Sequence, residues 1–126
     1  MTRIVIDLDG TLSVDSELPY SERIPNMAVV KKLREYHALG FNIVVHSSRN
    51  MRTYSGQIGK INVHTLPYIL EWLNRHDVPF DEIIVGKPWC ETAGFYVDDR
   101  AVRPSEFTSL SYDQILELLV GEKAAT

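Results

Sequence analysis

Four short runs of β-branched and aromatic residues divide the 126-residue chain and constrain its fold more than any other feature. They cover residues 4–6, 41–45, 83–85 and 95–97. Each run is apolar throughout and does not alternate with polar residues, which is typical of strands covered on both faces of a parallel sheet. The sequence therefore predicts four strands of a mainly parallel sheet.

Stretches with helical spacing of apolar residues occupy much of the chain outside these runs. They cover residues 30–37, 66–73 and 112–119. Pro67 is tolerated only near the start of a helix, which places the beginning of the second helix near His64 or Thr65. Ser111 and Gln114 have the spacing of a capping box, so the third helix is expected to begin there.

The order of these elements predicts an α/β fold, a three-layer sandwich around a mainly parallel sheet with right-handed crossovers. Only residues 87–94 separate the last two predicted strands, which is short for a parallel crossover. Those strands therefore either pair antiparallel or are joined by a compact loop that crosses the sheet. We expect a single domain over residues 1–126. Two long loops, at about 10–21 and 49–62, are candidate functional segments.

Charge and cysteine content exclude several classes of protein. There are 13 basic and 17 acidic residues, a net charge of −4, which is opposite to a nucleic-acid-binding surface, so no nucleic acid is expected as a partner. The single cysteine, Cys90, cannot close an intrachain disulfide, and the N-terminus lacks the apolar stretch of a signal peptide. No apolar run approaches the roughly 20 residues that span a bilayer. These observations predict a cytoplasmic protein without a membrane partner.

A residue whose side chain can take part in catalysis or ligand binding follows each predicted strand. These residues are Asp7, Ser47, Lys87 and the pair Asp98 and Asp99. In open α/β sheets, ligands bind outside the carboxyl ends of the strands. We therefore expect these side chains to converge at one edge of the sheet.

The segment DLDGT places two carboxylates, Asp7 and Asp9, where the first strand ends. One acid can attack as a nucleophile while the other transfers protons. Gly10 permits a turn that most residues resist. The alternative is that the segment only caps the strand with a turn.

Asp98 and Asp99 are adjacent acids whose mutual repulsion a divalent cation would offset. Together with Asp7 they would form a carboxylate and water site, which suits Mg²⁺ better than Zn²⁺. The alternative is a pair of solvated turn acids, one of them bonded to Arg100 or Arg103.

Three further residues have chemistry suited to an anion. Lys87 can bring its ammonium to a phosphoryl oxygen or to the Asp7 carboxylate, and Ser47 offers a hydroxyl at the same edge. Arg49, in the second long loop, is a candidate to meet an anionic substrate. Each of these side chains is also compatible with an ordinary solvated position.

In order, DLDGT, Ser47, Lys87 and Asp98-Asp99 resemble the four motifs of the haloacid dehalogenase (HAD) superfamily of phosphohydrolases over nearly the whole chain. The segments SRNMRTY, GKIN and GKPWC are further similar to small HAD phosphatases encoded with capsule polysaccharide biosynthesis. The resemblance implies a HAD-like, modified Rossmann-like fold whose central strand bears Asp7, flanked by the Ser47 strand and the Asp98 strand. Residues 12–21 have room for a flap only, which implies an open site without a cap domain and favours a homo-oligomer.

The resemblance also implies an activity, that of a Mg²⁺-dependent phosphomonoesterase acting through an aspartyl phosphate on a small phosphorylated substrate such as a sugar phosphate. Mg²⁺ would be held by the Asp7 carboxylate, the backbone carbonyl of Asp9 and the Asp98 carboxylate, with Asp99 helping through water or a hydrogen bond. Asp7 would attack phosphorus, and Asp9 would protonate the leaving group. The residues expected to hold the substrate are Ser47, Lys87, Gly10, Thr11, Ser48 and Arg49.

Other functions use similar residues. A phosphotransferase or a phosphoprotein phosphatase could share this fold and site, because the acceptor and the leaving group are not encoded by the motifs. A non-catalytic phosphate-binding protein would retain the fold alone. A receiver domain has adjacent acids after its first strand and its phosphoacceptor after the third, whereas here the adjacent acids come last, which disfavours that function.

Overall fold

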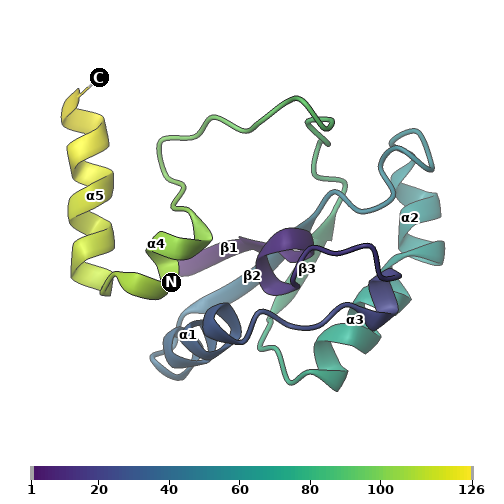
Figure 1. The fold of residues 1–126 in the computed structure, drawn as a ribbon, viewed down its shortest axis with the longest axis horizontal. Helices are drawn as coiled ribbons and strands as arrows, with labels where there is room; N and C mark the ends of the chain where they lie inside the picture. The colour runs from purple at the N-terminus through teal and green to yellow at the C-terminus, as the bar shows by residue number, and fades with distance from the viewer. Residues whose placement is uncertain (1, 126) are drawn as a thin grey trace. The chain divides into compact units, whose positions relative to one another are not determined.

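The structure is a computed structural model that describes residues 2–125, apart from the side chain of residue 124. The chain forms two compact units, residues 1–89 and residues 90–126. The first unit contains all the strands found in the described residues, and the second contains two helices (Figure 1).

The sheet of the first unit has three parallel strands in the order β1-β2-β3. They are β1 (Arg3–Asp7), β2 (Asn42–Ser47) and β3 (Glu82–Val85), which confirms the first three predicted strands. Asp7 lies opposite His46, and Ser47 lies opposite Val85. The three strands therefore end close together at one edge of the sheet.

Two helices pack on one face of this sheet. The connections from β1 to β2 and from β2 to β3 both move in the same direction across the sheet. Because such connections are right-handed, α1 (Met27–Ala38) and α3 (Leu66–Arg75) lie on the same side of the sheet. Arg34 of α1 donates hydrogen bonds to the carbonyls that follow α3. The buried side chains of this core include Ile6, Ile43, Val45, Val30, Leu33, Ile69, Trp72 and Leu73.

The connection between β2 and α3 contains a helix that the sequence did not predict, α2 (Ile58–His64). The helix that follows begins at Leu66, after the N-cap Thr65, with Pro67 in its first turn, as predicted. The first long loop is closed at its base by an antiparallel bridge between Ser13 and Pro25. Its tip holds the short 3₁₀ turn η2 (Tyr20–Glu22).

The predicted fourth strand is wrong, because residues 95–97 belong to no strand. Phe95 and Val97 are 79% and 89% exposed. β-Branched and aromatic residues favour a strand only where a neighbouring strand is present to form backbone hydrogen bonds with them. Three such residues have little preference for a strand of their own. Consequently β1 is an edge strand and β2 is central, so the expectation of a central Asp7 strand is also wrong. The α/β fold with a parallel sheet stands.

The second unit contains α4 (Pro104–Ser109) and α5 (Tyr112–Ala125). The backbone N–H of Ser111 donates to Gln114 Oε1 (2.8 Å), and that of Gln114 donates to Ser111 Oγ (3.2 Å), which confirms the predicted capping box. Ile115 and Leu119 of α5 are buried. Among the helices of the described chain, none combines the length and apolar character that crossing a membrane requires.

Asp81 ties the start of β2 to the segment before β3. Its Oδ2 accepts a hydrogen bond from the backbone N–H of Ile43 (2.8 Å), and its own N–H donates to the Ile43 carbonyl (2.8 Å). The hydrogen bond from Ile43 lowers the pKa of Asp81 more than burial raises it, and His37, 3.5 Å from Oδ1, lowers the pKa further. The ionised carboxylate is thus the form that stabilises this part of the sheet.

We expect Asp81→Asn to lower the melting temperature at neutral pH. Because the pKa of Asp81 is lower in the folded state, its stabilising contribution is present above the unfolded value of 3.8 and is lost as the pH falls through the folded value. Thermal unfolding from pH 7 down to pH 3 should therefore show the wild type and the variant converging below about pH 4. A difference in melting temperature that is independent of pH would contradict this role.

Candidate active site

Three predicted site residues come together at the carboxyl edge of the sheet. Asp7 ends β1, Ser47 ends β2, and Lys87 lies two residues beyond β3. Lys87 Nζ lies 3.5 Å from Asp7 Oδ1, and the backbone N–H of Lys87 donates to the Ser47 carbonyl (3.1 Å). The predicted convergence is confirmed for these three residues.

The Asp7 carboxylate is held from both sides. Thr11 Oγ1 donates a hydrogen bond to Oδ2 (3.1 Å), while Lys87 Nζ donates one to Oδ1 (3.5 Å). Burial raises the pKa of Asp7, and the positive charge of Lys87 and the hydrogen bond from Thr11 oppose that shift. The side chain is still 33% exposed, so a ligand can reach an oriented carboxylate.

The turn after β1 explains the glycine of DLDGT. Asp9 has φ −74° and ψ 124°, and Gly10 has φ 82° and ψ 0°, which are the values of a type II turn. The third residue of that turn needs a positive φ, so the prediction that Gly10 permits a turn is confirmed. Within the same segment, η1 (Leu8–Leu12), the backbone N–H of Ser13 donates to the Leu8 carbonyl (3.1 Å).

Asp9 forms a two-bond ion pair with Arg49. Nε and Nη2 of Arg49 lie 3.0 Å and 2.8 Å from the two carboxylate oxygens, and the Arg49 side chain is only 5% exposed. The guanidinium also lies over the Tyr20 ring, 4.1 Å from its centroid. Arg49 was predicted to meet substrate, and its pairing with Asp9 was not foreseen.

Ser47 and Ser48 shape the loop that carries Arg49. The buried Ser47 hydroxyl accepts a hydrogen bond from the backbone N–H of Arg49 (3.1 Å), which leaves its own proton available for donation. The Ser48 carbonyl accepts from Met51 N–H (3.1 Å). These bonds fix the direction in which Arg49 leaves the strand.

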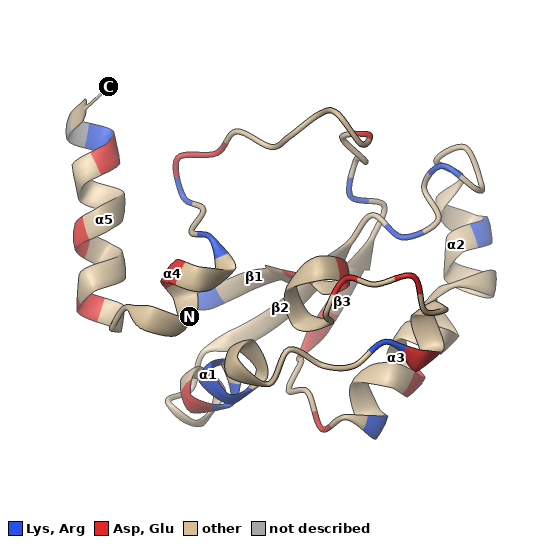
Figure 2. Cartoon of the chain, viewed as in Figure 1, with Lys and Arg blue, Asp and Glu red and all other residues tan. Residues whose placement is uncertain are grey.

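Sequence reasoning missed two residues of this region. His46 lies opposite Asp7 in the sheet register, and burial, followed by the charge of Lys87, lowers its pKa. Tyr20 was not singled out, although its place in a long loop could have marked it. Residues 48–70, between β2 and the middle of α3, include Arg49, Arg52 and Lys60 and no acidic residue (Figure 2).

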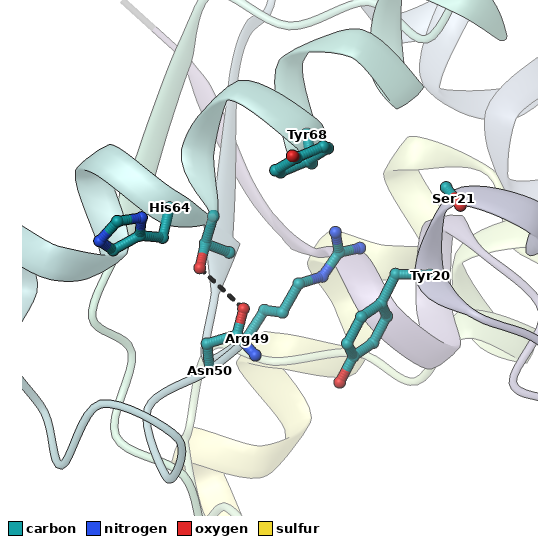
Figure 3. A pocket seen from close by; sticks show the side chains of 7 residues that line it. Tyr20, Ser21, Arg49, Asn50, His64 and Tyr68 are labelled. Atoms are coloured by element: carbon teal, nitrogen blue, oxygen red, sulfur yellow. Dashed lines mark hydrogen bonds between the residues drawn. The ribbon is translucent and has the colours of Figure 1, made fainter.

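A cavity of about 220 Å³ lies beside Arg49 (Figure 3). The residues that line it are Tyr20, Ser21, Arg49, Asn50, His64, Thr65 and Tyr68. Asn50 has φ 61°, a left-handed conformation that asparagine tolerates, and its Oδ1 accepts a hydrogen bond from Thr65 Oγ1 (2.7 Å). The cavity therefore combines aromatic walls with a hydrogen-bonded polar pair.

Asp98 and Asp99 belong to the second unit, where both are exposed in a turn. Asp98 Oδ1 accepts a hydrogen bond from the backbone N–H of Arg100 (2.7 Å). This contact resembles the solvated-turn alternative, although the donor is the backbone and not the guanidinium. Within residues 2–125, no three His, Cys, Asp or Glu side chains are grouped so as to hold a metal ion.

Comparisons with known proteins give one informative similarity. No protein-family model matches the chain, and no curated protein matches it. The chain is similar to a protein from Vibrio cholerae, an MCSG target whose crystal structure has been solved. The two sequences are 56% identical, and the two structures superpose with a TM-score of 0.94. The match covers 97% of this chain and 99% of the other. The two proteins therefore share their fold over almost their whole length.

We expect Gly10→Ala to destabilise the protein by about 1–2 kcal/mol, the cost of a left-handed conformation for a residue with a Cβ. An added Cβ would meet no atom within 4 Å, so the loss would come from the backbone conformation. Urea denaturation measures it. Gly59→Ala is the matched control, because Gly59 lies in α2 with equally open space, and there alanine should be neutral or stabilising. Equal stability of Gly10→Ala and the wild type would contradict the assignment.

Proposed function

We propose that this chain, which belongs to the same family as the Vibrio cholerae protein, is a phosphomonoesterase of the haloacid dehalogenase type that uses Asp7 as its nucleophile. The observation that carries the proposal is the Asp7 carboxylate at the end of a parallel strand with the Lys87 ammonium 3.5 Å away. A carboxylate in this position can attack phosphorus, and an adjacent cation can receive the charge of the phosphoryl group.

The geometry around Asp7 supports a role as nucleophile. Thr11 and Lys87 restrict the rotation of the carboxylate. The carboxylate therefore loses little rotational freedom when a phosphate ester binds. In the proposed reaction an Asp7 oxygen forms a bond to phosphorus while the bond to the leaving oxygen breaks. Lys87 and the Ser47 hydroxyl would bind the phosphoryl oxygens.

Asp9 is proposed as the proton donor and acceptor. It would give a proton to the leaving oxygen and then take one from the water that hydrolyses the aspartyl phosphate, which releases Asp7 and inorganic phosphate. In the structure, Arg49 occupies both Asp9 oxygens. Proton transfer therefore requires Arg49 to release one of them, and a phosphoryl oxygen is a suitable alternative partner for the guanidinium.

The proposed cofactor is Mg²⁺, which would neutralise charge on the phosphoryl group. Its ligands would be the Asp7 carboxylate, the backbone carbonyl of Asp9 and the Asp98 carboxylate, with Asp99 assisting. An all-oxygen donor set suits Mg²⁺, and both Asp7 and Asp98 are accessible carboxylates.

We expect Asp7→Asn to reduce release of phosphate from p-nitrophenyl phosphate by at least about 1,000-fold, because the amide is a poor nucleophile. Circular dichroism should show an unchanged fold. Asp113→Asn, the same substitution at an exposed position in α5, is the control and should retain activity. An active Asp7→Asn variant would refute the assignment of the nucleophile.

We expect Asp98→Asn to raise the Mg²⁺ concentration needed for half-maximal activity by at least about tenfold, since it removes a proposed ligand. Asp99→Asn, the matched neighbour, should raise it less, because Asp99 is assigned an indirect contact. Titration of the metal-stripped protein with Mg²⁺ measures both. Identical titration curves for the wild type and Asp98→Asn, or full wild-type activity in excess chelator, would contradict the assignment of the metal site.

A further inference from the structure

Two guanidinium groups lie over the ring of Tyr20, at the tip of the first long loop. The Arg49 guanidinium carbon is 4.1 Å from the ring centroid, and that of Arg23 is 4.6 Å from it. Figure 3 shows the Tyr20 ring beside the Arg49 guanidinium. The two arginine side chains are only 5% and 16% exposed, and a cation–π contact is strongest where the cation is withdrawn from water.

The loop that carries Tyr20 is anchored to α3 through backbone atoms. Trp72 Nε1 donates a hydrogen bond to the Arg23 carbonyl (2.9 Å), and Arg75 Nη2 donates one to the Ser21 carbonyl (2.7 Å). Trp72 is 2% exposed, so one of these anchors is set in the core. Neither anchor uses the side chain of Tyr20. A substitution at this position therefore removes the ring and leaves the loop attached.

Arg49 acts on the proposed reaction through the placement of its guanidinium. Nε and Nη2 hold both Asp9 oxygens, and the proposed reaction exchanges one of these bonds for a bond to a phosphoryl oxygen. A hydrogen bond depends on the direction of its donor, whereas a ring attracts a cation over its whole face. The contact with Tyr20 can therefore persist while Arg49 changes hydrogen-bond partners.

We propose that Tyr20 is a positioning residue that acts through Arg49. Its ring keeps the guanidinium beside Asp9, so that Asp9 is aligned to protonate the leaving oxygen and the guanidinium is in place when the phosphoryl group arrives. Tyr20 is assigned no contact with the reacting atoms. This role in catalysis rests on the proposed phosphatase function.

The test uses two esters of similar shape whose leaving groups differ in basicity, phenyl phosphate and p-nitrophenyl phosphate. Phenolate is the more basic leaving group, so its departure depends more on a proton from Asp9. Tyr20→Leu should therefore lower kcat/KM about tenfold for phenyl phosphate and only about twofold for p-nitrophenyl phosphate. A residue that served stability alone would change both values by the same factor.

Two further variants control for the ring and for the loop. Tyr20→Phe keeps the ring and should retain both values of kcat/KM. Leu18→Ala changes another exposed side chain of the same loop and keeps the Leu18 carbonyl, which accepts a hydrogen bond from Arg23 Nε (3.1 Å), so it should leave the ratio of the two values unchanged. An unchanged ratio in Tyr20→Leu, or an equal loss in Tyr20→Phe, would overturn the proposal.

Proton NMR of the Arg49 Nε–H group separates failure of this proposal from failure of the phosphatase. Exchange of this proton with water should be slow in the wild type, because it is bonded to Asp9 in a nearly buried side chain, and Arg49→Lys identifies its resonance. Tyr20→Leu should make the exchange about tenfold faster, and Tyr20→Phe should not. If the wild type hydrolyses neither ester but exchange depends on the ring, the phosphatase function fails and the positioning of Arg49 by Tyr20 stands. Exchange that Tyr20→Leu leaves unchanged would overturn that positioning.

Discussion

The ion pair between Lys87 and Asp7 is the interaction on which the rest of the site depends. Asp7 ends β1, whose neighbouring strand β2 is largely buried, and burial alone would favour the uncharged form of Asp7. Lys87 opposes that effect from the far side of the sheet, because it follows β3, whereas Asp7 ends β1. The parallel register that brings all three strand ends to one edge is thus what makes a usable carboxylate possible.

A second charge pair extends the site away from the sheet. Arg49 holds Asp9, and the Tyr20 ring covers the guanidinium, so the first loop, the turn after β1 and the loop after β2 are joined at one side chain. A nearly buried guanidinium needs such partners. The same residue borders the cavity, and a ligand that engaged Arg49 would therefore alter the surroundings of Asp9.

Local patterns predicted the strands of the first unit and the start of one helix in each unit. Three of the four apolar runs became β1, β2 and β3, Pro67 marked the start of α3, and Ser111 with Gln114 marked the start of α5. These features succeed because proline, capping residues and apolar runs act over a few residues. The run at residues 95–97 failed, because a strand exists only with a partner, and partners are chosen by tertiary packing. The helix α2 was missed because residues 49–62 lack a clear apolar stripe.

The sequence by itself determined which chemical groups follow the strands, since Asp7, Ser47 and Lys87 each stand directly after an apolar run or one residue beyond it. Only the tertiary structure decided which of those groups interact. Asp9 pairs with Arg49, 40 residues away, and Tyr20 covers that pair, because the folded loops bring their side chains within a few ångströms. Spacing along a chain specifies contacts across one turn or one strand, whereas contacts between loops depend on how the whole core packs.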